Sequence, residues 1–96
     1  MTATAKRFKS LHAMPRYFFH VDRDGEHIID EEGSDLSSLE SVLDLARRAA
    51  ADLAADDLKH GVQSLEQFIL VENESGQDVA RVRVAAMLEV QTERWA

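Results

Sequence analysis

The pattern of apolar and polar residues predicts a β-hairpin near the start of the chain. Residues 16–22 (RYFFHVD) are aromatic and β-branched, which is typical of a half-buried strand. Asp24-Gly25 follows, and this dipeptide favours a tight turn because glycine adopts a positive φ without strain. We expect residues 26–30 (EHIID) to return as the second strand and residues 31–35 to form a loop.

The next segment predicts one long helix over roughly residues 38–59. Ser37 and Glu40 have the spacing of a capping box, in which the serine accepts from a first-turn N–H and the glutamate reaches back. Lys59 suits the negative end of the helix dipole, and Gly61 favours termination just beyond it. Apolar residues recur at three- and four-residue steps, which predicts one buried stripe: Leu39, Val42, Leu43, Ala46, Ala49, Ala50 and Leu53.

A second hairpin follows the helix. Residues 66–72 (EQFILVE) contain four consecutive apolar side chains, residues 73–76 (NESG) have turn chemistry, and residues 78–84 (DVARVRV) alternate as a strand does. The tail over residues 85–96 fits a helical stripe and a strand equally well. The order strand, strand, helix, strand, strand predicts an α+β domain (ββαββ), with one long helix packed on a small antiparallel sheet.

Both faces of the predicted sheet carry large apolar side chains, whereas a single helix covers only one face. With Asp24-Gly25 as the turn, Phe18 falls on the face opposite to Phe19. Burying one Phe, Ile or Val side chain contributes about 1.5–3 kcal/mol, so we expect the tail or a second chain to cover the remaining face. The predicted interface of a homodimer consists of Phe18, Ile29, Ile69, Val71 and Trp95.

Charge is distributed unevenly over a chain whose formal net charge is −7. Residues 1–16 carry +4 and residues 17–96 carry −11. We predict a flexible basic extension over residues 1–13 and a single domain over residues 14–96. The acidic body disfavours nucleic acids and anionic membranes as partners. The chain has no cysteine and no apolar run near the ~20 residues of a membrane-spanning helix, so a cytoplasmic location is expected.

His20, Asp22 and His27 are the candidate metal ligands. The assumed hairpin register places them on one face, and two imidazoles with a carboxylate form a metal-ligand set. A cross-strand pair between Asp22 and His27 explains the same residues without a metal. A calcium loop aligned on Gly25 fails, because His20 occupies the first ligand position and the flanking segments are strands.

The sequence has no motif for nucleophilic or phosphate chemistry. It contains no Gly-x-Ser-x-Gly elbow, and its four glycines are isolated from one another. Arg81 and Arg83 share one strand face, where such a pair is more typical of salt bridges than of a ligand site. We expect no cofactor and a non-enzymatic protein-interaction or regulatory module that acts as a homodimer. The alternatives are an antitoxin-like regulator linked to nucleic acid and a metal-binding protein.

Three short motifs carry a family resemblance: residues 14–20 (MPRYFFH), Asp24-Gly25, and residues 30–33 (DEEG) ahead of an alanine-rich helix. Together they resemble a family of short uncharacterised bacterial proteins, a domain-of-unknown-function group whose members typically start Met-Pro-Arg-Tyr-Phe-Phe-His. The resemblance implies that Met14 is the usual start. It implies no activity, catalytic residue or cofactor, and family members usually end soon after the second hairpin.

Overall fold

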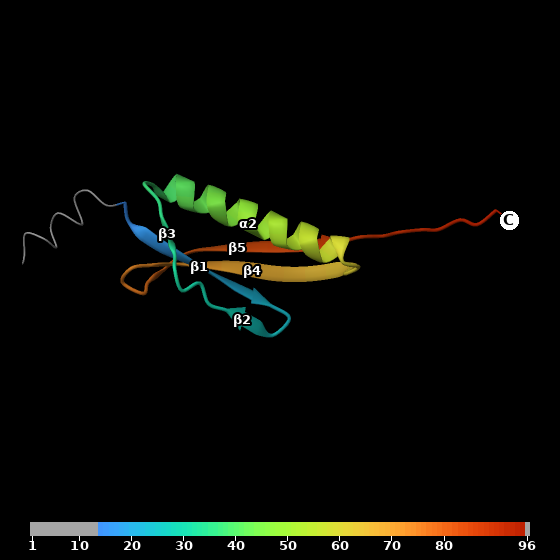
Figure 1. Cartoon of the computed structure of the whole chain (residues 1–96), viewed down its shortest axis with the longest axis horizontal. Helices are drawn as coiled ribbons and strands as arrows, with labels where there is room; N and C mark the ends of the chain where they lie inside the picture. Colours follow the sequence, from blue (N-terminus) through green and yellow to red (C-terminus); the bar gives the residue numbers. More distant parts are fainter. Residues whose placement is uncertain (1–13, 96) are drawn as a thin grey trace, which may run out of the picture.

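The computed structural model describes residues 14–95, and within them one helix lies on one face of a five-stranded antiparallel sheet (Figure 1). The prediction of a flexible extension over residues 1–13 falls outside this range. The α+β class and the order of the elements are confirmed. The elements are β1 (Arg16–Arg23), β2 (Glu26–Ile28), β3 (Ser34–Asp35), α2 (Leu39–Lys59), β4 (Ser64–Asn73) and β5 (Asp78–Met87).

The sheet order is β2-β1-β4-β5, so β1 lies inside the sheet and β5 forms one edge. The short β3, which the sequence did not predict, pairs with the start of β1 on the same side as β2. β4 pairs with β1 along seven residue pairs and with β5 along nine. β4 is therefore, with β1, one of the two inner strands of the described sheet, and backbone hydrogen bonds join it to both of its neighbours.

The first hairpin has the predicted register, with Asp22 opposite His27 and Arg23 opposite Glu26. Asp24 and Gly25 both have a positive φ, of 48° and 77°, as the favoured two-residue hairpin turn requires. β2 ends at Ile28, so the predicted second strand is two residues too long.

Helix α2 begins one residue later than the predicted capping box requires. The cap is Ser38 instead of Ser37, and its hydroxyl accepts a hydrogen bond from the Ser41 backbone N–H at 3.1 Å. Leu39, predicted to lie on the buried stripe, is 54% exposed. The residues that the helix buries lie at four-residue steps: Val42, Ala46, Ala50 and Ala54.

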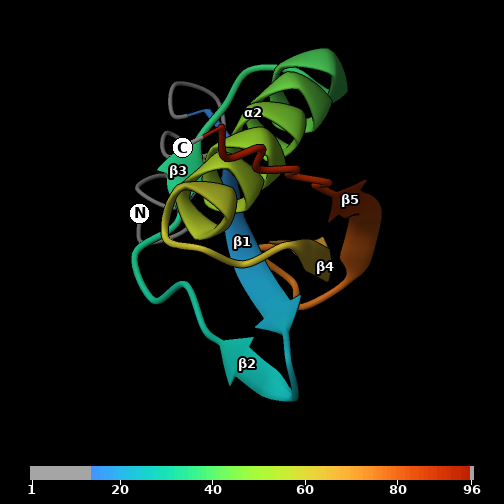
Figure 2. The same ribbon diagram turned by 90° about the vertical axis from the view of Figure 1, so that its right-hand side faces the viewer.

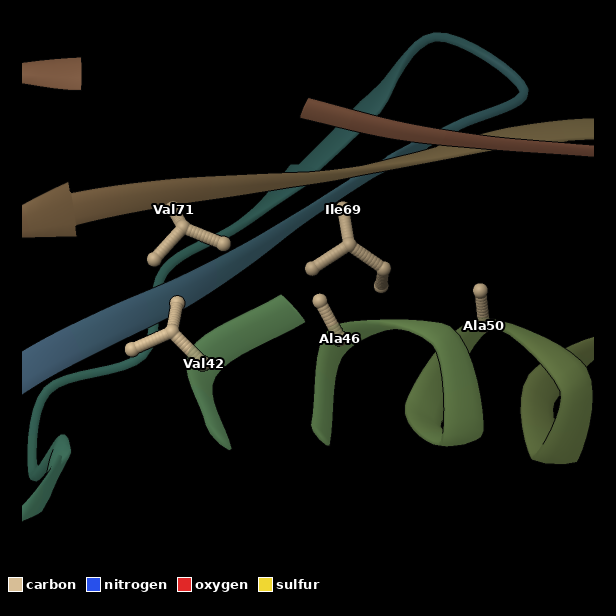
Figure 3. Close-up of a cluster of buried hydrophobic side chains, with 5 residues drawn as sticks. All are labelled: Val42, Ala46, Ala50, Ile69 and Val71. Carbon is tan, nitrogen blue, oxygen red and sulfur yellow. The ribbon is translucent and has the colours of Figure 1, made fainter. Parts of the chain in front are cut away.

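The core lies between this stripe of α2 and the centre of the sheet (Figure 3). Ile69 and Val71 of β4 point at the helix and are 1% and 0% exposed. The prediction that these two residues form an interface with a second chain is therefore wrong. The reason is the pairing of β1 with β4, which places Val71 opposite Phe19 and hence on the face that the helix covers.

β4 and β5 each reach further than the sequence predicted. β4 includes residues 64–73, and β5 continues to Met87, three residues beyond its predicted end. After β5 the chain runs on as a tail, residues 88–95, which has no regular secondary structure and extends away from the two layers (Figure 1). The view in Figure 2 shows α2 on one side of the sheet, with β5 at the edge remote from β2.

Candidate functional site

The sheet face that α2 does not cover, called here the open face, carries most of the side chains with ionisable or aromatic chemistry. Directly paired residues of antiparallel strands share a face, so the registers define its members. They are Phe18, His20 and Asp22 of β1, His27 of β2, Glu66, Phe68, Leu70 and Glu72 of β4, and Arg81 and Arg83 of β5. Phe18, Phe68 and Leu70 are half-buried on this face.

His20 is held by hydrogen bonds at both ring nitrogens. The Asp30 backbone N–H donates to Nδ1 at 3.1 Å, and Nε2 lies 3.3 Å from Glu72 Oε1. Because Nδ1 accepts, the ring proton resides on Nε2 and is directed at the Glu72 carboxylate. Neither nitrogen of His20 is left to bind a metal ion.

His27 forms the cross-strand pair with Asp22 that the alternative interpretation predicted, through Nδ1 and Oδ1. Its ring centroid lies 5.9 Å from that of His20. The three predicted ligands therefore share the open face but do not converge on one point. Among residues 14–95, no group of three His, Asp or Glu side chains is arranged to hold a metal ion. The described residues therefore give no support to a metal site at His20, Asp22 and His27.

Asp30 fills the gap on the outer side of β1 between β2 and β3. Its Oδ2 accepts from the Phe19 N–H at 3.0 Å, and its Oδ1 accepts from the N–H groups of Glu32 and Gly33 at 3.2 and 3.0 Å. Burial alone raises the pKa of this carboxyl, but the three donors and nearby His20 outweigh burial and hold the pKa below its ordinary value. Sequence reasoning placed Asp30 at the end of the second strand and gave it no role of its own.

Gly33 and Arg16 fasten the rest of this loop to β1. Gly33 has a φ of 73°, and a Cβ added there would lie 2.9 Å from the Arg16 Cγ, the Phe18 ring and the Tyr17 carbonyl oxygen. Arg16 donates to both Asp35 carboxylate oxygens, at 2.9 and 3.2 Å. The hydrogen bond and the charge of Asp35 raise the pKa of Arg16 above its ordinary value. The motif at residues 30–33 therefore holds this loop against β1.

A hollow of about 440 Å³ lies at the turn end of the open face, where the β1–β2 turn meets Glu66, Phe68 and Arg81. The Arg81 guanidinium stacks on the Phe68 ring, 4.1 Å from its centroid. Next to it, Arg83 Nε donates to Glu66 Oε2 at 2.7 Å. Arg81, Arg83 and Glu66 are therefore each engaged with a side chain of the neighbouring strand.

A polar cluster, also missed by sequence reasoning, ties the end of α2 to the sheet on the covered face. Gln67 is 1% exposed, and its Nε2 donates to Asp57 near the helix C-terminus. Arg23 also donates to Asp57, at 3.4 Å. The Gln67 Oε1 finds no donor in the described part of the chain. The cluster positions α2 along β4 at the expense of one unsatisfied acceptor.

Four exposed large apolar side chains follow one another at the end of β5 and in the tail. They are Met87, Leu88, Val90 and Trp95, with Trp95 exposed by 87%, whereas other exposed apolar residues of the described region, such as Met14, Leu39 and Val79, lie elsewhere. Of the other predicted interface residues, Ile69 and Val71 are buried under α2, and the remaining two lie elsewhere. Ile29 is exposed beside β2, at the opposite side of the sheet, and Phe18 is half-buried on the open face.

Comparison with family models matches residues 16–85 to the family described as a domain of unknown function, DUF6894. The chain belongs to the DUF6894 family. The DUF6894 match includes all of β1 to β4, α2 and most of β5, whereas the tail lies outside it. No curated protein and no solved structure matches the chain. None of residues 14–95 of this DUF6894 protein forms a helix with the length and apolarity that crossing a bilayer requires.

Proposed function

We propose that this DUF6894 protein is a non-enzymatic protein-interaction module of the cytoplasm that acts as a homodimer. The observation that carries the proposal is the run of exposed apolar side chains from the end of β5 into the tail: Met87, Leu88, Val90 and Trp95. Apolar groups gathered on one part of a surface are typical of contacts between proteins. Burying one of these side chains in an interface contributes about 1.5–3 kcal/mol to the free energy of association. A second copy of the chain is present wherever the first is made, and most soluble oligomers are formed from identical chains.

The charge distribution favours a protein partner over a nucleic acid. From residue 14 onward, 8 Lys and Arg oppose 18 Asp and Glu, a net charge of −10. Phosphate backbones bind proteins mainly through Lys and Arg, so this body repels them. The antitoxin-like alternative has no supporting feature among the residues described. The lack of cysteine agrees with a reducing compartment.

The ionisable groups of the open face support a structural role over a catalytic one. His20 is hydrogen-bonded at both nitrogens, and His27 is paired with Asp22. A general acid or base must reach a substrate proton, and groups already engaged in this way are not free to do so.

The experiment is light scattering of the full chain over a dilution series in the micromolar range. The proposal expects a mass of about twice the 10.8 kDa of one chain, falling toward 10.8 kDa on dilution. A mass of one chain throughout the series would overturn the homodimer.

A further inference from the structure

We propose that the tail, residues 88–95, adds as an antiparallel strand to the outer edge of β5 in a second copy of the chain. The two tails are then exchanged symmetrically, and the two sheets join into one through their β5 edges. This inference rests on the proposed homodimer and names the contact that makes it.

The backbone of β5 leaves an edge ready for pairing. The Leu88 N–H donates to the Gln63 carbonyl at 2.7 Å, in register with Met87 opposite Ser64. Along an antiparallel strand, one residue directs its N–H and C=O groups at the neighbouring strand, and the next residue directs both groups to the opposite side. Even-numbered residues here therefore face β4. Odd-numbered ones, from Arg81 to Met87, turn their N–H and C=O groups to the outer edge, where no strand of residues 14–95 pairs with them.

The side chains of the tail alternate in the way that this edge requires. Odd positions of the tail are Glu89, Gln91, Glu93 and Trp95, and even positions are Leu88, Val90, Thr92 and Arg94. On β5 the odd positions 81 and 83 are arginines on the open face, and the even positions 82 and 84 are valines on the helix side. Antiparallel pairing matches odd with odd and even with even, so Glu89 can meet an arginine, and Leu88 and Val90 can meet the valines.

The register with Ala86 on the two-fold axis satisfies both kinds of contact and sets both valines opposite large apolar side chains. It places Arg83 opposite Glu89 of the partner subunit, Val84 opposite the partner's Leu88, and Val82 opposite the partner's Val90. Arg83 already binds Glu66 on β4, at 2.7 Å. It would then lie between two carboxylates on adjacent strands, an arrangement that stabilises cross-strand pairing.

Two competing pairings fit less well. If the β5 edges alone were paired about Val82, Arg81 would lie opposite Arg83 of the partner subunit, and like charges directly opposite are destabilising. A fold-back of the tail onto its own β5 would need a turn directly after Met87. There the chain instead continues straight, with Leu88 still bonded to Gln63 (Figure 1).

The first experiment compares the masses of Gln91→Pro and Gln91→Ala with that of the parent chain. Gln91 is an exposed tail residue outside the helix and the strands, and its amide donates to Glu89 of the same tail at 3.1 Å, so we expect neither change to affect folding of the domain. Proline removes the N–H that the register pairs with Arg81 of the partner subunit, whereas alanine keeps it. We expect Gln91→Pro to weaken self-association about a hundredfold, about tenfold for each exchanged tail, and Gln91→Ala to leave it unchanged.

The second experiment locates the two-fold axis by disulfide formation. The chain has no cysteine, so Ala86→Cys introduces a single thiol at the axis, opposite its own copy. Non-hydrogen-bonded pairs hold their Cα atoms near 4.5 Å, about the distance that a disulfide spans. With oxidised glutathione, Ala86→Cys should form a covalent dimer, whereas Ala80→Cys, on the same strand and face, should not.

The outcomes separate this inference from the proposed function. A dimeric parent with a monomeric Gln91→Pro and a cross-linked Ala86→Cys supports tail exchange. A dimer that persists in Gln91→Pro overturns tail exchange and leaves the homodimer standing, made through another surface. A monomeric parent overturns both.

Discussion

Replacing Asp30 by alanine tests whether this carboxylate holds the loop at residues 30–35 on β1. The change removes the acceptor of three N–H groups, of which those of Phe19 and Gly33 are partly buried. A hydrogen bond to a charged acceptor contributes about 1.5–3 kcal/mol, and the lower value applies because water reaches this loop. Two such bonds give a loss of about 3 kcal/mol in the free energy of unfolding.

The assay is urea denaturation followed by far-ultraviolet circular dichroism, with the slope of the transition checked for constancy. The matched control is Glu31→Ala, which changes the exposed neighbour in the same loop. It should stay within about 0.5 kcal/mol of the parent. If Asp30→Ala lies in that same range, the reasoning about the loop is refuted.

The same carboxylate predicts a pH dependence. Because the folded-state pKa of Asp30 lies below its ordinary value of 3.8, the charged form stabilises the fold. This contribution is complete above the pKa of the unfolded chain and is lost as the pH falls through the lower, folded-state pKa. The difference in unfolding free energy between the parent and Asp30→Asn should therefore be constant near neutral pH and shrink in acid. A difference that grows on acidification would contradict the assigned direction.

Three further substitutions test other parts of the fold by the same denaturation assay. Gly33→Ala should cost about 1–3 kcal/mol, because its Cβ meets a backbone carbonyl at 2.9 Å, and should cost more than Gly25→Ala, whose Cβ meets open space. Val71→Ala should cost about 2 kcal/mol, since the side chain is fully buried, against less than about 0.5 kcal/mol for exposed Val79→Ala. Asp22→Ala should cost at most about 1 kcal/mol, because its pair is exposed; a larger loss would show a role beyond pairing.

Local signals in the sequence were enough to predict the hairpin and the helix. Asp24-Gly25 determines the turn and thereby the register of three residue pairs, because these two residue types adopt the positive φ values of a two-residue hairpin turn with little conformational strain. The periodicity from Val42 to Ala50 reports the face of α2 that packs on the sheet. Each feature depends on residues that are close neighbours in the chain.

Features that depend on distant pairing could not be predicted in this way. The period-two pattern of β4 shows that Ile69 and Val71 share a face, but only the register with β1 shows that this face is the covered one. The acceptor role of Asp30 likewise depends on where Phe19 lies in the folded sheet. Within the candidate site, the pairing of Asp22 with His27 could be predicted from the sequence, because the Asp24-Gly25 turn determines which residues of the hairpin lie opposite each other.

The position of β1 inside the sheet has a consequence for synthesis on the ribosome. β1 and β2 emerge early and can form their hairpin at once, but the other side of β1 pairs with β4, more than forty residues further along the chain. Until β4 leaves the exit tunnel, the backbone groups on that side of β1 have no strand of the same chain to pair with. The nascent chain is thus most open to aggregation during this interval, and the loop closure that ends it sets the pace of folding.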